Sequence, residues 1–226
     1  MSKDQSLWYF ENVNLFKVLC PHKIKNLEQK HEFHFYDKNE FIYFPEEHAR
    51  HIYMIAEGRV KIGGYTDDGK EIIKSILGTG EIFGEMALTG EEKRTDFAMA
   101  MDKNTSLCTV SLEEMKDLMA ENKDFSFKIY KLIGLRIRKL ERKVESLVFK
   151  DARTRIIEFI RDAAEWKGQK VGFETMIKTK LTHKDIADLT GTSRQTVTTV
   201  LNELKDKNLI NFNRRQILIR DMDKLH

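Results

Sequence analysis

The chain has 226 residues and a net charge of +3, which is enough length for one large or two modest domains with apolar cores. No run of about 18 apolar residues occurs and the polar N-terminus lacks the apolar stretch of a secretion signal, so we expect a cytoplasmic protein without a membrane span. Cys20 and Cys108 lie far apart, which fits a reducing compartment and provides too few thiolates for a four-cysteine iron–sulfur cluster within one chain.

The charge is unevenly distributed along the chain. Residues 1–124 hold 16 basic and 23 acidic side chains, residues 125–150 hold 8 and 2, and residues 151–226 hold 15 and 11. Proteins that bind nucleic acid neutralise phosphates with such a basic excess. We therefore expect the C-terminal half, and not the acidic N-terminal part, to contact nucleic acid.

Residues 1–123 predict a β-roll domain. From about residue 30 to 112 the sequence alternates short apolar segments such as Ile52–Ala56 and Arg59–Ile62 with turns, and Asp67–Gly69 predicts a hairpin turn. Eight of the twelve glycines fall in this stretch. Dense glycine with alternating apolar residues favours a small β-roll or barrel over a βαβ domain.

Residues 124–149 predict one long helix, with Asp124 as its N-cap. Apolar residues recur along it at spacings of three and four, as in a coiled-coil seam: Tyr130, Ile133, Ile137, Leu140, Val144 and Leu147. The alternative is that this helix packs only on its own β-domain. Flanking charges leave a narrow apolar stripe, so we predict that the helix joins two copies of the chain as a parallel homodimer.

Residues 150–226 predict a winged helix-turn-helix domain, helical from residue 151 up to a terminal β-hairpin. Thr182 and Asp185 form a capping box at one helix start, and Gly191 provides the left-handed residue of a turn. Ser193 caps a second helix, whose apolar face consists of Val197, Val200, Leu201 and Leu204. Leu209–Phe212 and Gln216–Ile219 would form the wing.

The opposite face of this second helix carries side chains that can bond base edges in a major groove: Arg194, Gln195, Thr196 and Thr199. The alternative is an ordinary helical hairpin. Helix starts and the wing tip provide candidates for phosphate contacts: Thr182, His183, Lys184, Ser193 and Arg215. For the wing tip, a solvated turn is the alternative.

The order of β-roll, long helix and winged helix-turn-helix resembles the CRP/FNR family of bacterial transcription regulators over essentially the whole chain. Two motifs carry the resemblance, Gly80–Leu88 followed by Arg94-Thr95, and Thr192–Val197. The resemblance implies an α+β fold in which an effector-sensing β-roll carries a phosphate-binding cassette for a cyclic nucleotide. It also implies two partners, namely double-stranded DNA with an inverted-repeat site and RNA polymerase.

Four cassette residues follow from this resemblance: Gly84, Glu85, Arg94 and Thr95. Gly84 would let backbone amides approach a phosphate, and Glu85 would accept from a ribose hydroxyl. Arg94 and Thr95 would donate to the cyclic phosphate. In the second motif, Arg194 would read a guanine and Gln195 an adenine.

The sequence departs from the family pattern at the expected effector site. Cyclic-AMP-responsive members hold the adenine with two adjacent hydroxyl residues, where this chain has Leu140 and Glu141. Asp96 stands where small residues are usual; on a strand it would share a face with Arg94, pair with it and repel a phosphate. We therefore expect weak or no cyclic-AMP binding.

The sequence leaves alternatives to a cyclic nucleotide as the effector. Haem would need an axial histidine, for which the candidates are His22, His31, His34, His48 and His51, although lone histidines on a β-surface are more often plain surface residues. A regulator without a switch is a further alternative. No nucleophile–base pairing, metal motif or P-loop occurs, so we expect no enzyme. The competing function is a cyclic-nucleotide receptor that regulates a partner protein without binding DNA.

Overall fold

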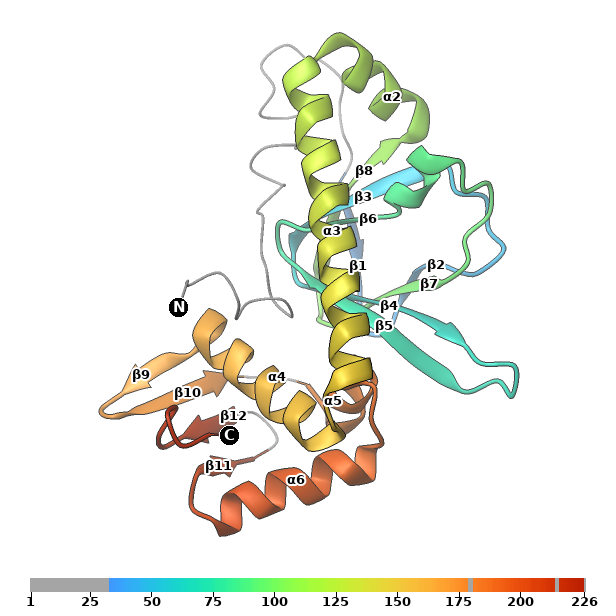
Figure 1. Cartoon of the computed structure of the whole chain (residues 1–226). Helices are drawn as coiled ribbons and strands as arrows, with labels where there is room; N and C mark the ends of the chain where they lie inside the picture. Colours follow the sequence, from blue (N-terminus) through green and yellow to red (C-terminus); the bar gives the residue numbers. More distant parts are fainter. Residues whose placement is uncertain (1–32, 179–180, 214–215, 226) are drawn as a thin grey trace. The chain divides into compact units, whose positions relative to one another are not determined.

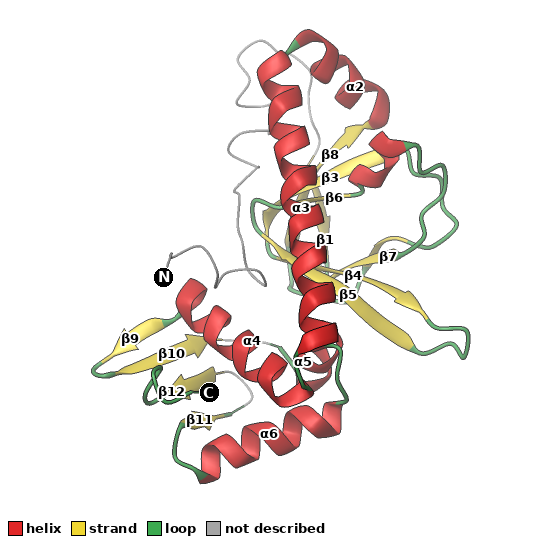
Figure 2. Ribbon diagram, viewed as in Figure 1, coloured by secondary structure: helices red, strands yellow, loops and turns green. Residues whose placement is uncertain are grey.

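The computed structural model describes residues 33–178, 181–213 and 216–225, and the chain divides into two compact units between Gly134 and Leu135. The first unit contains the predicted β-roll (Figures 1 and 2). Its strands are β1 (Phe33–Tyr36), β2 (Phe41–Tyr43), β3 (His51–Glu57), β4 (Arg59–Tyr65), β5 (Glu71–Gly78), β6 (Ile82–Phe83), β7 (Phe97–Ala100) and β8 (Thr105–Ser111). A short 3-10 helix, η2 (Glu85–Thr89), follows β6.

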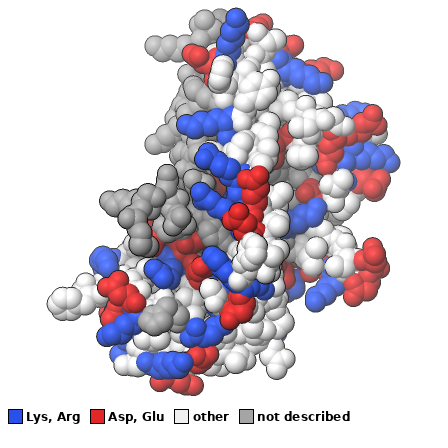
Figure 3. Space-filling model, in the orientation of Figure 1, with Lys and Arg blue, Asp and Glu red and all other residues white. Residues whose placement is uncertain are grey.

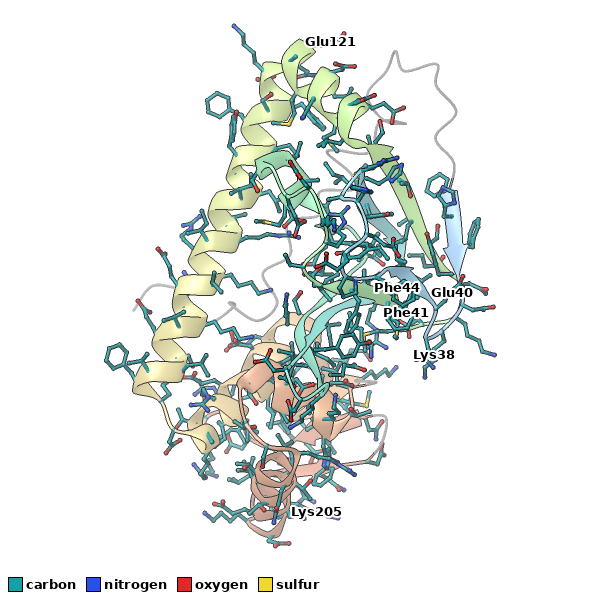
Figure 4. All side chains as sticks on the ribbon, turned by 90° about the vertical axis from the view of Figure 1, so that its right-hand side faces the viewer. Lys38, Glu40, Phe41, Phe44, Glu121 and Lys205 are labelled. Atoms are coloured by element: carbon teal, nitrogen blue, oxygen red, sulfur yellow. The ribbon has the colours of Figure 1, made fainter. Side chains whose placement is uncertain are left out.

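The eight strands form two antiparallel sheets, in the orders β1-β8-β3-β6 and β2-β7-β4-β5. The predicted turn at Asp67–Gly69 joins β4 to β5, and Gly69 has a φ of 77°. Figure 4 shows Phe41 and Phe44 side by side near β2, where their rings stack with centroids 4.3 Å apart. The β-roll prediction is confirmed.

Strand β3 is buried on both faces, which explains its unbroken apolar sequence. Because side chains alternate along a strand, Tyr53 and Ile55 join one apolar cluster with residues of both sheets. Ile52 and Met54 join a second cluster with α2 (Leu112–Glu121) and the beginning of α3 (Lys123–Phe149). The β-roll core therefore extends under these two helices.

The long helix α3 begins one residue before its predicted start, and the prediction of Asp124 as its N-cap is wrong. The Asn122 side-chain oxygen accepts from the amide of Phe125 at 3.0 Å. Asn122 has extended backbone angles, which a capping residue needs, whereas Asp124 already lies in the first helical turn. Asn122 therefore separates α2 from α3 and caps the second of them.

The second unit contains the winged helix-turn-helix domain. Its helices are α4 (Ala152–Lys167), α5 (His183–Thr190) and α6 (Arg194–Asp206), and its strands are β9 (Gln169–Val171), β10 (Glu174–Lys178), β11 (Ile210–Phe212) and β12 (Gln216–Ile219). The strands form one sheet in the order β11-β12-β10-β9, and the predicted wing hairpin is β11–β12.

The expectation that this unit stays helical up to the wing is wrong for residues 169–178. There, β9 and β10 form a hairpin around Gly172, which has a φ of 63°. Thr175 and Ile177 alternate with more exposed neighbours and face the core, as in a half-buried strand. Pairing of β10 with the distant β12 fixes this hairpin in the sheet.

Candidate nucleic-acid interface and effector cassette

The helix-turn-helix has the local structure that its sequence predicts. Asp185 donates its amide to Thr182 Oγ1 at 3.1 Å, and the Asp185 carboxylate accepts from the Thr182 amide at 2.7 Å. Gly191 ends α5 with a φ of 63°, which allows the sharp turn into α6. The turn is therefore fixed by a capped helix on one side and a left-handed glycine on the other.

Helix α6 buries one face and exposes the predicted reading face. Ser193 accepts from the Thr196 amide at 3.0 Å and so caps the helix. The predicted apolar residues Val197, Val200, Leu201 and Leu204 are all buried. On the other side, the structure brings together three exposed base-reading candidates, Arg194, Gln195 and Thr199.

The remaining base-reading candidate, Thr196, has a different environment. It is half-buried, and its hydroxyl lies 2.8 Å from that of Ser193, the capping residue. Sequence reasoning also missed Asn202, which is exposed on α6. Its spacing of seven residues from Gln195 and three from Thr199 was the available signal, because residues at these spacings share a helix face.

His183 connects the two helices of the motif. Its Nδ1 lies 2.9 Å from Thr198 Oγ1, and the same hydroxyl donates to the Arg194 carbonyl at 2.9 Å. Burial, followed by the positive charge of Arg194, lowers the pKa of His183, which favours a neutral ring at pH 7. His183 is therefore placed to orient α6 against α5, and a neutral ring would contribute little charge to a phosphate contact.

Of two other candidates for phosphate contacts, the structure describes Lys184 but not Arg215. Lys184 lies at the start of α5, with its Nζ 3.3 Å from the Asp188 carboxylate one helical turn later. Arg215 lies outside the described residues. Lys205, labelled on α6 in Figure 4, lies over the Phe212 ring with 5.7 Å between its Nζ and the ring centroid. Lys205 therefore belongs to the packing between α6 and the wing strand.

A buried arginine of α4 holds the turn between α5 and α6 through hydrogen bonds to its backbone. Arg155 of α4 donates to three backbone carbonyls: Thr190 at 2.8 Å, Gly191 at 3.0 Å and Lys150 at 2.6 Å. Leu147 also lies against the turn, because a Cβ added to Gly191 would come within 2.6 Å of Leu147 Cδ2. The turn is thus held by α4 and by the end of α3.

The expected effector cassette surrounds η2. Gly84 precedes it with a φ of 78°, and Glu85 is buried. Arg94 is 2% exposed; its Nη1 donates to the Gly84 carbonyl at 3.0 Å and its Nη2 to the His51 carbonyl. Its guanidinium carbon lies 4.6 Å from the centroid of the Tyr43 ring. Arg94 is therefore immobilised by the β-roll itself.

The predicted pair between Arg94 and Asp96 is wrong. Residues 94–96 are not part of a strand, so the expected shared face does not exist. Asp96 instead accepts from the Tyr43 hydroxyl at 3.2 Å and lies 3.6 Å from Lys74 Nζ. Burial raises the pKa of Asp96, and the Lys74 charge opposes that rise.

A different carboxylate contacts the two predicted phosphate ligands. Glu91 Oε2 lies 3.5 Å from Arg94 Nη1. Glu91 Oε1 accepts from the Thr95 hydroxyl at 3.1 Å and from the Thr95 amide at 3.4 Å. The sequence pattern does not single out Glu91, because its contacts depend on how the loop between η2 and β7 folds.

Helix α3 has two contrasting faces. Phe125, Ile129 and Leu132 are buried in the β-roll core, and Ile133, which was predicted in the seam, is half-buried beside them. The other predicted seam residues, together with Phe127, Val148 and Phe149, form a set of exposed apolar side chains: Phe127, Tyr130, Ile137, Leu140, Val144, Leu147, Val148 and Phe149. Figure 3 shows basic side chains beside uncharged ones along this helix.

The described residues offer neither a metal-binding cluster nor a membrane-spanning helix. No group of three or more histidine, cysteine, aspartate or glutamate side chains could hold a metal ion there. Over the same residues, no helix combines the length and apolar character needed to cross a membrane. His34, His48 and His51 are exposed on the β-roll, whereas His22 and His31 lie outside the described residues.

Each of the two units matches a model of a known protein family. Residues 33–122 match the model of the cyclic nucleotide-binding domain, and residues 154–226 match that of the Crp-like helix-turn-helix domain. The chain is 26% identical to the global nitrogen regulator of a Nostoc species over 81% of this chain and 83% of the relative. It is also 26% identical to the CRP-like cAMP-activated global transcriptional regulator of Mycobacterium tuberculosis over 84% of each chain.

Solved structures share the fold of this chain. A CooA mutant from Carboxydothermus hydrogenoformans is 28% identical, covers 97% of each chain and has a TM-score of 0.78. FixK2 from Bradyrhizobium japonicum, at 24% identity, shares the fold with a TM-score of 0.75, over 88% of this chain and 96% of that one.

Proposed function

Because this chain belongs to the CRP/FNR family of transcription regulators, we propose that it binds an inverted-repeat DNA site as a homodimer under the control of its β-roll. The observation that carries the proposal is α6, whose capped N-terminus exposes Arg194, Gln195 and Thr199 opposite a fully buried apolar face. Arginine matches the two acceptors of guanine, and glutamine matches adenine. Asn202, on the same face, extends the candidate reading surface by one turn.

The apolar face of α3 supports the proposed homodimer. Large side chains such as Tyr130, Ile137 and Leu140 are more than half exposed in a single copy, and leaving them in water forfeits the free energy of burying apolar surface. Gly134 adds to this argument, because among the described residues no atom other than those of its chain neighbours and its own helix backbone lies within 4 Å of where its Cβ would be, which leaves room for a partner helix to approach. A two-fold dimer would present two α6 helices to two half-sites.

The sequence-independent part of binding would come from phosphate contacts. The amides at the start of α5 and the Lys184 side chain are the candidates there, with Arg215 at the wing as a further one. RNA polymerase is the proposed partner in transcription. The segment at residues 166–172 is a candidate for that contact only because of its position before the helix-turn-helix, and the hairpin β9–β10 exposes Val171 and Phe173 there.

The effector is proposed not to be tightly bound cyclic AMP. Some relatives are named as cAMP-activated regulators, but this chain has Leu140 and Glu141 where such members hold the adenine. Losing two hydrogen bonds to the base would weaken affinity by about tenfold to a hundredfold.

Selection of binding sites from a random DNA pool, combined with sedimentation of the free and DNA-bound protein, tests the proposal. We expect an enriched inverted repeat bound by two copies of the chain. A folded protein that enriches no motif would contradict the DNA-binding part. A motif without internal symmetry, bound by one copy, would contradict the homodimer.

A further inference from the structure

The carboxylate of Glu91 contacts the residues that would hold an anion in the cassette. A cyclic phosphate needs a cation and hydrogen-bond donors around its oxygens. The predicted donors are the Arg94 guanidinium and the Thr95 hydroxyl, and both of them contact Glu91. The Thr95 amide also donates to the same carboxylate. One internal side chain therefore uses three donors that a phosphate would need.

Arg94 has little freedom to move away from Glu91 and bind a phosphate instead. Its side chain is 2% exposed, two backbone carbonyls accept from it, and the Tyr43 ring lies against its guanidinium. The nitrogen that contacts Glu91, Nη1, is also the one that donates to the Gly84 carbonyl. An incoming phosphate that approached Nη1 would therefore meet the Glu91 carboxylate at the same place.

The Glu91 side chain is partly removed from solvent on the side of Arg94, which strengthens its effect. Its side chain is 15% exposed, whereas the neighbouring Glu92 is exposed and the nearby ion pair of Lys93 with Glu46 lies at the surface. Charges that are partly removed from water interact more strongly than those at the surface. A phosphate beside Glu91 would suffer the repulsion of two like charges.

We propose that Glu91 occupies the phosphate position of the cassette from within, so that this β-roll binds a cyclic nucleotide only by displacing it. Glu91 thereby acts as a specificity residue that discriminates against anionic ligands. Asp96, which is bonded to Tyr43 and Lys74, has no such role. The inference deepens the proposed function and rests on it for the identification of the β-roll as the sensing domain.

Calorimetric titration with cyclic AMP and cyclic GMP tests this assignment on the full-length protein. Glu91→Gln keeps the size of the side chain and removes its charge, and Glu91→Ala removes the group altogether. We expect each variant to bind at least one of the two nucleotides about tenfold or more tightly than the wild type does. Glu92→Gln is the matched control, since it removes one negative charge from the adjacent exposed position, and should leave affinity unchanged.

A second measurement covers ligands too weak for calorimetry. In an amide proton–nitrogen NMR spectrum, inorganic phosphate should shift the Thr95 amide signal of Glu91→Ala and leave that of the wild type in place. Equal nucleotide affinity in the wild type and both folded variants would overturn the assignment, as would an equal Thr95 response to phosphate. If one of the two Glu91 variants fails to fold, comparison of the other variant with the wild type tests the assignment.

These outcomes are independent of the outcome of DNA binding. Site selection with the wild-type protein tests the regulator, and the titrations test only the cassette. A protein that selects an inverted repeat while Glu91→Ala gains no affinity would keep the proposed function and lose this inference. The reverse result would keep the assignment of Glu91 and refute the DNA-binding function.

Discussion

Two buried arginines show how burial restricts what a charged side chain can do. Desolvation of a guanidinium is costly unless acceptors surround it. Arg94 has carbonyls, a ring and Glu91 around it, and Arg155 has two carbonyls at the turn of the helix-turn-helix and a third at Lys150. Arg194, in contrast, is exposed at the start of α6. Of the three, only Arg194 is free to reach a base edge.

Replacing Arg155 with lysine should destabilise the protein by about 1–3 kcal/mol, because one ammonium group cannot reach three carbonyls in the fixed directions of a guanidinium. Denaturant unfolding measures this change. Arg153→Lys is the control, since Arg153 is about one-third exposed and pairs with Glu203 at 3.4 Å, and it should change stability by less than about 1 kcal/mol. Equal effects of the two substitutions would refute the assigned role of Arg155.

Arg194→Ala should weaken binding to the selected site by about 1–3 kcal/mol and relax the choice of guanine at one position in each half-site. Site selection and titration of the selected DNA measure both effects. Lys205→Ala, at the far end of the same helix and packed on Phe212, should preserve the motif. Recovery of the wild-type motif at wild-type strength by Arg194→Ala would show that α6 is not the reading helix.

Gln195→Glu should move the preference at the neighbouring base pair from adenine toward cytosine, because the amide both donates and accepts whereas the carboxylate only accepts. The measurement is again site selection, compared position by position with the wild type. An unchanged base preference at every position would place Gln195 outside the set of reading residues.

At the scale of elements, α3 combines two functions along one helix. Phe125, Ile129 and Leu132 anchor its first half in the β-roll core, while the face that carries Tyr130 and Ile137 stays exposed. A face of this kind is expected where a second helix packs. The helix therefore provides both a part of the β-roll core and a candidate dimer seam.

Ile137→Asp should convert the dimer to a folded monomer, because it would bury a carboxylate in the seam. Since Ile137 is 53% exposed in a single copy, the substitution should leave the fold of each copy intact. Sedimentation at micromolar concentration measures the change, and Arg138→Ala, also exposed on α3, is the control that should remain dimeric. A wild-type protein that sediments as a monomer would contradict the seam altogether.

The features predicted correctly from the sequence are mostly local. The capping box of Thr182 with Asp185 and the turn at Gly191 need only a few neighbouring residues, so their pattern determined them. The hairpin β9–β10 was missed because β10 is fixed by pairing with β12, some forty residues later in the chain. Likewise, Asp96 bonds to Tyr43, 53 residues away, which no local pattern could show.

At the scale of the whole molecule, binding should require two half-sites with one rotational phase, because both reading helices of a symmetric dimer must face the same side of the duplex. Inserting about 5 base pairs, roughly half a helical turn, between the half-sites should weaken binding strongly. The affinity for the altered site, measured by titration, should approach that for a single half-site. Unchanged affinity after the insertion would mean that the two halves bind independently.

The contact between Leu147 and Gly191 has a consequence for the length of the DNA site. Leu147 belongs to the candidate seam, and Gly191 ends α5 in the turn that leads to the candidate reading helix α6. Both lie in the same compact unit, so in a dimer formed through α3 the separation of the two reading helices is set by packing inside that unit. A side chain at position 191 would clash with Leu147 Cδ2 and would strain a left-handed backbone, so either Leu147 or the turn before the candidate reading helix would have to shift. Divergence at this one position could thus change which operator lengths a related regulator recognises, while every base-contacting residue stays the same.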